Sequence, residues 1–378
     1  MQNALTDRII RKLKAGRLVY GILSACIPDK AVTVTDDTVQ RSLAQLESYY
    51  PDGGSSCLIS NRINPNPTCD LTILIPAYNV ERYVEECLNS IFSQQTTYSY
   101  RVKVIDDGST DNTWSKLQRY RERPDIELIR KENGGGLGGA LNVGLKEIDS
   151  RYVMCVDADD ALMPDAIQCM LDALCANDDV DIVEGQNEHF YGTRVLERSR
   201  AEELVTDDWT VLSGFTTRKV YRSFLFDGIG IPERYWFEDT VGHVVRFCHA
   251  RKVMIIPNLV YRYRQNPEGI CSSAQKNYKA LDTFWVTKRL MQDRVKLNKP
   301  FTQRDYGIFL AQVAHDIYRL SWMGEDVIRA LTVLYIDIRR TYFPTCKAKD
   351  RKGKVVEKLL DAGRIKHLAL FCRYVYFS

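Results

Sequence analysis

The chain has 378 residues, of which 45% are hydrophobic and 27% charged, and its formal net charge is +3. This length predicts two or three folding units of an ordinary globular protein, and the charge is too small for a general nucleic-acid binder. Eleven cysteines without a C-x-x-C pair predict reduced thiols in a cytoplasmic protein. Neither the cysteines nor the five histidines have the spacing of metal ligands. No run of about 18 apolar residues occurs, so no membrane-spanning helix is predicted.

Residues 1–69 are expected to form a separate N-terminal helical extension and linker. Helical periodicity runs through 7–23 and 36–50. Gly, Pro and Asn then interrupt the chain between 51 and 69, as they do in a linker. The sequence assigns no function to this extension.

From residue 70 to 273, apolar runs alternate with helical patterns. The predicted strands are 71–77, 101–107, 126–131, 151–157 and 180–185. The predicted helices between them are 84–95, 110–122, 140–148 and 165–176. This alternation is typical of right-handed β-α-β crossovers, so we expect an α/β fold with a Rossmann-like, mostly parallel sheet flanked by helices.

Residues 274–378 are expected to form a C-terminal helical region, with helices at 278–292 and 306–320, for example. Its tail, 339–378, holds eleven Lys and Arg against three Asp and Glu, and it ends in apolar and aromatic residues. Two structures fit this composition. One is a stretch that lies on an anionic membrane surface, and the other is a helix packed on the domain with a solvated basic face.

Polar or glycine-rich segments follow four of the predicted strands. Ligands bind beyond the carboxyl ends of parallel strands, so we expect these segments to meet at one edge of the sheet. The segments are 76–79, 106–109, 133–139 and 157–160. The last places three carboxylates directly after a buried strand. Like charges this close repel, so a divalent metal, a basic side chain or solvent is expected beside them.

Two enzyme classes share part of this pattern. The glycines 134–139 satisfy the dinucleotide pattern G-x-G-x-x-G, and Asp157 follows about 20 residues later. However, these glycines follow the third strand instead of the first, and two further carboxylates accompany Asp157. Aspartyl-phosphate phosphatases carry D-x-D after their first strand, with a threonine where Ala161 stands here.

A nucleotide-diphosphate site would use all four segments. Asp159, with or without Asp157, would bind Mg²⁺ or Mn²⁺ through hard oxygen ligands, and the metal would bind the diphosphate. Asp107 would accept the N–H of a uracil ring, and Tyr78 would stack on that base. Taken alone, the segment 106–109 is more typical of a helix-capping turn, but together with the other segments it favours the nucleotide site.

Five sequence segments, in this order and spacing, resemble glycosyltransferase family 2 across about residues 70–273. They are LTILIPAYNVERYVEECLNSIFSQQ, VKVIDDGSTDNT, NGGGLGGALNVGL, YVMCVDADDALMPDAI and FEDTVGHVVRFCHARKVMIIPNLVYRYRQNPEGICSS. The resemblance implies a GT-A fold and an inverting transferase with a nucleotide-sugar donor, often UDP-linked, and a divalent metal. It divides the domain into a nucleotide-sugar half, 70–185, and an acceptor half, 186–273.

The resemblance also implies roles for individual residues. The nucleotide-contacting positions are Pro76, Tyr78, Glu81 and Asp107. Asp157 and Asp159 match the D-x-D motif, in which Asp159 is the direct metal ligand. Asp239 matches the catalytic base, although an acid there is also typical of a helix N-terminus.

Three further features refine this prediction. Tyr263 and Arg264 match a C-terminal flap that meets the diphosphate. Leu141 precedes Asn142 where the family usually carries arginine, so no arginine contact to the donor is expected from this helix. The Q-x-x-R-W motif of processive synthases is absent, so one sugar is expected to move in each binding event.

We therefore expect an inverting enzyme that moves one sugar from a UDP-linked donor to a hydroxyl of a glycan or lipid-linked acceptor. Its expected setting is capsule or other cell-surface polysaccharide synthesis, in the cytoplasm or on the inner face of the membrane. The alternative is a non-catalytic subunit that binds a nucleotide-sugar or glycan within an assembly complex. The sequence names neither the sugar nor the acceptor.

Overall fold

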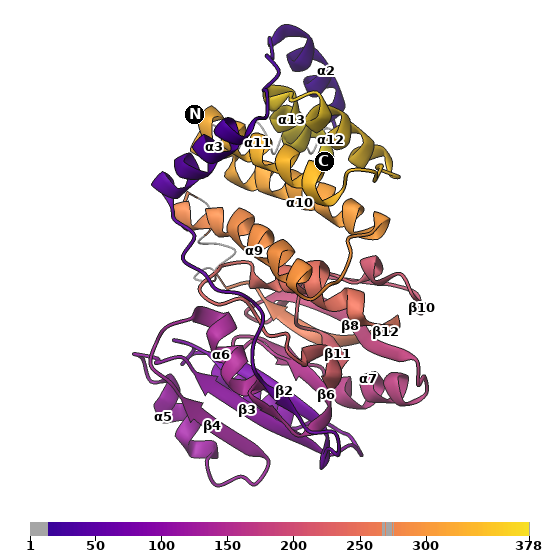
Figure 1. Ribbon diagram of the computed structural model, residues 1–378. Coiled ribbons are helices and arrows are strands. Elements are labelled where there is room, and N and C mark those ends of the chain that lie inside the picture. Colours follow the sequence, from indigo (N-terminus) through magenta and orange to yellow (C-terminus); the bar gives the residue numbers. More distant parts are fainter. Residues whose placement is uncertain (1–13, 267–268, 270–273, 275, 378) are drawn as a thin grey trace. The chain divides into compact units, whose positions relative to one another are not determined.

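The structure is a computed structural model that describes residues 14–266, 269, 274 and 276–377 (Figure 1). The chain divides into two compact units that do not follow one another along the sequence. The helical unit consists of Met1–Asp52, Ser273–Trp285 and Lys299–Ser378, and the sheet unit consists of Gly53–Ser272 and Val286–Asn298. The division into domains at residues 69 and 273 stays a prediction.

The sheet unit is built on a ten-stranded sheet in the part of the chain that the structure describes. Its main strands run in the order β10 (Leu204–Thr206), β12 (Lys252–Arg264), β8 (Val180–Tyr191), β11 (Lys219–Arg222), β6 (Ser150–Cys155), β2 (Cys69–Ala77), β3 (Tyr100–Asp106) and β4 (Ile126–Arg130). β7 (Ala161–Leu162) pairs with β12, and β9 (Arg194–Arg198) pairs with β8. The pairings give β12, β8, β6, β2, β3 and β4 one direction, with β11 reversed between β8 and β6. The predicted mostly parallel sheet is confirmed.

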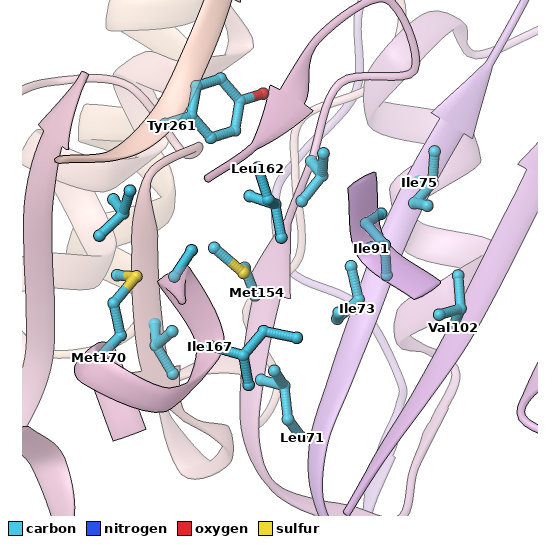
Figure 2. Close-up of a cluster of buried hydrophobic side chains, with 14 of the residues drawn as sticks. Leu71, Ile73, Ile75, Ile91, Val102, Met154, Leu162, Ile167, Met170 and Tyr261 are labelled. Atoms are coloured by element: carbon cyan, nitrogen blue, oxygen red, sulfur yellow. The ribbon is translucent and has the colours of Figure 1, made fainter. Parts of the chain in front are cut away.

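Helices cover both faces of this sheet. They are α4 (Val84–Phe92), α5 (Thr113–Leu117), α6 (Gly136–Leu145) and α7 (Ala166–Cys175). Alternate residues of β2, Leu71, Ile73 and Ile75, point to one face, where Figure 2 shows them with Ile91 of α4 and Ile167 of α7. All five side chains are fully buried, and each buried aliphatic side chain contributes about 1.5–3 kcal/mol.

On the opposite face of the sheet, α6 packs closely because it carries glycine. A Cβ at Gly144 would lie 2.9 Å from atoms of Leu74 and Ile105. This helix begins at Gly136, earlier than the predicted residue 140. Gly135 precedes it with φ 93°, a left-handed conformation that glycine adopts without strain.

The predicted helices and strands also differ from the observed ones elsewhere. The helix expected over 110–122 is shorter, because α5 ends at Leu117 and a single 3₁₀ turn, Gln118–Tyr120, follows it. The reversed strand β11 was not predicted, since its four residues lie in an irregular stretch of sequence. A third prediction, the helix over 7–23, is only partly covered: residues 7–13 lie outside the described chain, and α2 spans Gly16–Cys26.

The helical unit joins the N-terminal residues to the C-terminal ones. Its longer helices are α2, α3 (Asp36–Tyr49), α10 (Gln303–Leu320), α11 (Glu325–Tyr342), α12 (Arg351–Asp361) and α13 (Ile365–Phe371), and α9 (Asp282–Lys296) begins in it. Asp326 of α11 accepts hydrogen bonds from the Tyr49 hydroxyl at 2.6 Å and from Gln45 at 3.1 Å, both on α3. The N-terminal helices therefore stabilise the C-terminal ones.

The basic tail packs as helices within the helical unit. Leu360 of α12 and Leu368 of α13 are fully buried. Of the two structures that the sequence left open, the packed helix is the one observed. Arg339 is buried, but other basic side chains of the tail remain on the surface, and the exposed ones include Lys347, Lys349, Arg351, Lys354, Lys358 and Arg364. Among the described residues, no helix is long and apolar enough to cross a membrane.

Candidate active site

The segments after the parallel strands are bonded to one another at the carboxyl edge of the sheet. The Asp107 N–H donates to the Ala77 carbonyl at 2.9 Å, and the Lys131 N–H donates to the Asp106 carbonyl at 3.0 Å. The Asn79 N–H donates to the Ser109 hydroxyl at 3.0 Å. Hydrogen bonds therefore link the segments after β2, β3 and β4.

Two of the predicted nucleotide positions have the exposure that base recognition needs. The Tyr78 ring is 48% exposed, so one of its faces is available for stacking. Pro76 is half-buried near the end of β2, where it pairs with Ile105 of β3. Glu81 has a local partner, since its carboxylate accepts the N–H and the side-chain amide of Asn112, both at 2.8 Å. This makes Glu81 a loop-stabilising residue in the structure.

Asp107, the predicted uracil acceptor, is 5% exposed and forms an ion pair with Lys131. The Lys131 ammonium also donates to the Gly134 carbonyl at 2.6 Å and to the Glu132 carbonyl at 2.8 Å. Lys131 thus links the second strand's loop to the glycine loop. Sequence reasoning missed it, although its place directly after the third strand was a usable signal.

The acidic cluster after β6 lies at the same edge and is electrostatically strained. Burial, together with the neighbouring carboxylates of Asp159 and Asp239, raises the pKa of Asp157 to about 8. Asp160 is 1% exposed, and burial raises the pKa of its carboxyl well above the usual value. Among described residues, no side chain or backbone N–H donates to the Asp157 carboxylate, whose backbone N–H donates to the Tyr261 hydroxyl at 3.1 Å.

The flap residue Arg264 lies against this cluster. Its backbone N–H donates to Asp160 Oδ1 at 2.7 Å, and its Nε donates to the Asp159 carbonyl at 2.6 Å. Its Nη2 pairs with Glu86 at 2.5 Å, and Asn266 donates to Asp159 Oδ2 at 3.0 Å. The Tyr263 ring instead lies 4.9 Å from the His189 ring. Residues 267–268 and 270–273 of the quoted motif lie outside the described residues.

The donor set fits a hard divalent cation that a ligand helps to hold. Described residues form no group of three or more His, Cys, Asp or Glu side chains arranged to bind a metal by themselves. Mg²⁺-type sites usually use one or two carboxylates plus substrate phosphates and water. Asp159 and Asp157 match that arrangement, and the raised pKa of Asp157 marks negative charge that a cation would compensate.

Asp239 reaches the same edge from the second half of the sheet unit. It lies in the 3₁₀ turn Glu238–Thr240, after Phe237 in a left-handed conformation with φ 63°. Its Oδ1 accepts the Thr216 N–H at 3.0 Å, and Thr217 forms a β-bridge with Cys155 at the end of β6. Burial raises the pKa of Asp239, which makes it a stronger base than a solvated aspartate.

Gly138 of the glycine cluster allows close packing against the segment before Asp239. A Cβ at Gly138 would lie 2.4 Å from the Pro232 carbonyl oxygen. Asn142 donates to the Ile231 carbonyl at 2.8 Å and to Glu233 at 3.0 Å, so it fixes the segment before Asp239. Leu141 is buried, which agrees with the absence of an arginine contact from α6.

Comparison with known proteins identifies the segment that contains these loops. Residues 72–231 match the sequence family described as Glycosyl transferase family 2. The chain carries a glycosyl transferase family 2 domain. Asp239 lies eight residues beyond the matched range, in the same sheet unit.

Two curated relatives share this family 2 domain. Poly(ribitol-phosphate) beta-N-acetylglucosaminyltransferase TarS of Staphylococcus aureus is 26% identical over 230 residues, which cover 58% of this chain and 39% of TarS. The uncharacterized glycosyltransferase EpsJ of Bacillus subtilis is 27% identical over 241 residues, which cover 57% of this chain and 69% of EpsJ. The match thus spans well under half of the length of TarS.

Solved structures confirm the fold of the family 2 domain. The crystal structure of S. aureus TarS 1-349 in complex with UDP-GlcNAc has 19% sequence identity and a TM-score of 0.53, covering 82% of this chain and 91% of that one. The predicted GT-A fold is therefore confirmed.

Proposed function

We propose that this protein is an inverting glycosyltransferase that moves one sugar from a UDP-linked donor to a hydroxyl of a glycan or lipid-linked acceptor. One observation carries the proposal: Asp239 and the acidic cluster converge at one sheet edge although about 80 residues separate them. Thr217 pairs with Cys155 at the end of β6, and the Asp239 carboxylate raises the pKa of Asp157, as expected for groups that lie close together. A purely structural role for either acid does not require this proximity.

The loops after β2, β3 and β4 would bind the nucleotide. The exposed Tyr78 ring would stack on the base, with Pro76 beneath it. The Asp107 carboxylate would accept the base N–H, and Lys131 would keep that carboxylate oriented. A UDP donor is supported by the relative TarS, whose crystal structure holds UDP-GlcNAc.

The acidic cluster would receive the diphosphate together with Mg²⁺ or Mn²⁺. Asp159 would be the direct ligand, and Asp157 would orient the donor beside it. When bound, the cation supplies positive charge that stabilises the departing diphosphate. The Arg264 side chain, at the end of β12, donates to the Asp159 carbonyl, and its guanidinium would face the diphosphate as part of the flap.

Transfer then needs a single proton acceptor. The acceptor hydroxyl would attack the anomeric carbon while Asp239 removes its proton. The new glycosidic bond forms as the bond from the anomeric carbon to the diphosphate oxygen breaks. UDP leaves with the electron pair of the broken bond, and a single displacement inverts the anomeric configuration.

The biological setting proposed is cell-surface polysaccharide synthesis on the cytoplasmic face of a membrane. The names of TarS and EpsJ, a polymer-modifying transferase and an uncharacterized glycosyltransferase, support the enzyme class. The exposed lysines and arginines of the tail support reversible attachment to anionic lipid, at about 1 kcal/mol per charge.

Release of UDP from UDP-sugars, with and without Mn²⁺, tests this proposal against a non-catalytic binding subunit. The full chain should release UDP from at least one UDP-sugar in the presence of Mn²⁺, and chelation should stop the release. A chain that binds UDP tightly but releases none from any donor, even with candidate glycan acceptors added, would instead be a binding subunit.

A further inference from the structure

A buried lysine lies behind the proposed base. Lys219, the first residue of β11, is fully buried, and its ammonium lies 3.0 Å from Glu184 on the neighbouring strand β8. The two residues are direct cross-strand neighbours. Glu184 also pairs with Arg218 at 2.7 Å. Removing such charges from water costs free energy, which is offset only where the ion pair has good geometry and further hydrogen bonds satisfy both groups.

The remaining bonds of this pair all go to one loop, Ser213–Thr216. The Lys219 ammonium donates to the Ser213 hydroxyl at 2.8 Å and to the Phe215 carbonyl at 2.6 Å. The Ser213 N–H donates to Glu184 at 2.9 Å. The ion pair therefore fixes the loop at both of its ends.

The same loop holds Asp239. The N–H of Thr216 donates to Asp239 Oδ1 at 3.0 Å, one residue after the carbonyl that Lys219 binds. The Thr216 carbonyl is fixed as well, by the Tyr221 hydroxyl at 3.1 Å. A continuous path of hydrogen bonds thus runs from Glu184 through Lys219 and the loop to Asp239.

The backbone on both sides of this path is strained. Arg218, just before Lys219, has φ 55°, and Phe237, two residues before Asp239, has φ 63°. Left-handed conformations are unfavourable for such bulky residues, and they persist where surrounding contacts enforce them. The Arg218 carbonyl is held by the Gly185 N–H at 3.1 Å.

We propose that Lys219 is a positioning residue for the reaction: paired with Glu184, it fixes the Ser213–Thr216 loop so that the Thr216 N–H orients the Asp239 carboxylate. The inference rests on the proposed function, in which Asp239 is the base. Lys219 does not touch substrate, since it is fully buried.

The positive charge of Lys219 and the Thr216 hydrogen bond both favour the ionised form of the Asp239 carboxyl. The groups that face Asp239 are the cations Lys219 and Arg246, the acid Asp157, and the neutral Tyr221 and Cys155. The two cations lower the pKa of Asp239, partly offsetting the effect of burial, which raises it. A neutral side chain at 219 would therefore leave Asp239 protonated up to a higher pH.

The pH profile of sugar transfer distinguishes a role of Lys219 in positioning Asp239 from a purely structural role in the sheet. We expect Lys219→Met to lower kcat by roughly tenfold or more and to move the acidic limb of the profile up by about one pH unit. In Lys219→Arg the acidic limb should lie at the same pH as in the parent protein, because arginine keeps the positive charge. Lys252→Met is the matched control, since Lys252 pairs with Asp179 on the surface of the same sheet. An unmoved acidic limb in Lys219→Met would overturn the proposal.

A second readout does not depend on activity or on how well Lys219→Met folds. The Thr216 amide reports the charge of Asp239, so its chemical shift in ¹⁵N-threonine-labelled protein should titrate with that carboxyl. Thr216→Ser assigns the signal, and Asp239→Asn should abolish the titration. The double variant Glu184→Gln/Lys219→Met removes both charges, so that neither is left buried alone.

The titration midpoint should rise in Lys219→Met and in the double variant, and it should stay at the parent value in Lys219→Arg and Lys252→Met. Equal midpoints in all five proteins would overturn the role of Lys219. If the midpoints shift as expected but the parent transfers no sugar, the proposed function fails while the coupling of Lys219 to Asp239 stands.

Discussion

The two units of the chain carry opposite charge. The helical unit holds 24 Lys and Arg against 15 Asp and Glu, and the sheet unit holds 28 against 34, so their formal net charges are +9 and −6. The overall value of +3 conceals this difference. Three acids of the sheet unit, Asp157, Asp159 and Asp160, follow β6 at the edge of the sheet. In the helical unit, exposed bases of the tail include Lys349, Arg351 and Lys358.

One aspartate from each unit illustrates the difference. Asp316 of the helical unit is fully buried and accepts hydrogen bonds from Thr283 at 2.7 Å and Gln312 at 2.8 Å, and also from the Tyr335 hydroxyl. The Asp157 carboxylate receives no such bond from any residue that the structure describes. Asp157 is only half-buried, so its carboxylate is accessible to a bound cation.

The largest expected effect concerns Asp239. Asp239→Asn keeps the size of the side chain but removes its ability to accept a proton, so sugar transfer should fall by roughly 10²–10⁴-fold. UDP and Mn²⁺ should bind as in the parent. Steady-state kinetics and calorimetry measure the two quantities separately. Turnover close to that of the parent would mean that Asp239 only helps to begin a 3₁₀ turn, a role that asparagine also fills because it is a good capping residue.

The acidic cluster provides the next largest effect. Asp159→Ala should weaken Mn²⁺-dependent UDP binding by more than the roughly 10- to 100-fold that loss of an outer-shell partner costs. Asp160→Asn should change it less, because Asp160 accepts the Arg264 N–H inside the protein. Calorimetric titration of UDP at fixed Mn²⁺ compares the two variants. A larger loss of UDP affinity in Asp160→Asn than in Asp159→Ala would contradict the assignment of Asp159 as the metal ligand.

Membrane attachment tests the surface of the helical unit. Replacing Arg351, Lys354 and Lys358 of α12 with glutamate should release the full chain from anionic vesicles, since each basic residue contributes about 1 kcal/mol. Cosedimentation at low salt measures binding, and transfer activity in detergent-free solution should not change. Truncation is a poorer test because the tail's apolar side chains are buried. Equal binding by the reversed-charge variant would exclude α12 as the lipid contact.

Asp316 provides the structural counterpart to the catalytic acids. Asp316→Asn should lower the free energy of unfolding by roughly 1–3 kcal/mol, because an amide cannot accept all of these hydrogen bonds. Transfer and UDP binding should stay at parental values. Chemical denaturation followed by circular dichroism measures the loss. A selective loss of transfer with unchanged stability would contradict the division of roles between the units.

The last expected effect is a dependence of the free energy of unfolding on pH in the absence of metal. The folded-state pKa of Asp157 is raised to about 8, so the folded protein holds this proton more tightly than the unfolded chain. Its stabilising contribution is full below pH 4 and is lost as the pH rises towards 8, at less than about 1.4 kcal/mol per pH unit. Asp157→Asn should lack this decline and become more stable than the parent at pH 8. If the stabilities of the parent and of Asp157→Asn change with pH in parallel, the pKa of the Asp157 carboxyl is not raised.

Much of the sheet unit follows from local sequence. Apolar runs of strand length alternate with helical patterns from residue 70, and the order of loops along the sheet edge follows from parallel strands. The α/β class, the GT-A fold and the family are confirmed. The roles of Pro76, Tyr78, Glu81, Asp107, Asp157, Asp159 and Asp239 stay predictions.

What the sequence did not predict depends on contacts between distant residues. The reversed strand β11 has only four residues, and its place in the sheet is fixed by pairing with β6 and β8. Lys219 looks like any surface lysine in the sequence, and only the fold buries it beside Glu184. The N-terminal extension had no assigned role because its packing partner, α11, lies about 280 residues away.

The most direct test of the account is the affinity of the parent chain for UDP, measured by calorimetry with Mn²⁺ and with a chelator. The account predicts markedly tighter binding with Mn²⁺, and by linkage UDP should tighten Mn²⁺ binding by the same factor. Asp159→Ala should bind UDP equally under both conditions. Equal affinity of the parent with and without Mn²⁺ would contradict the central claim, because the acidic cluster would then be an ordinary solvated loop.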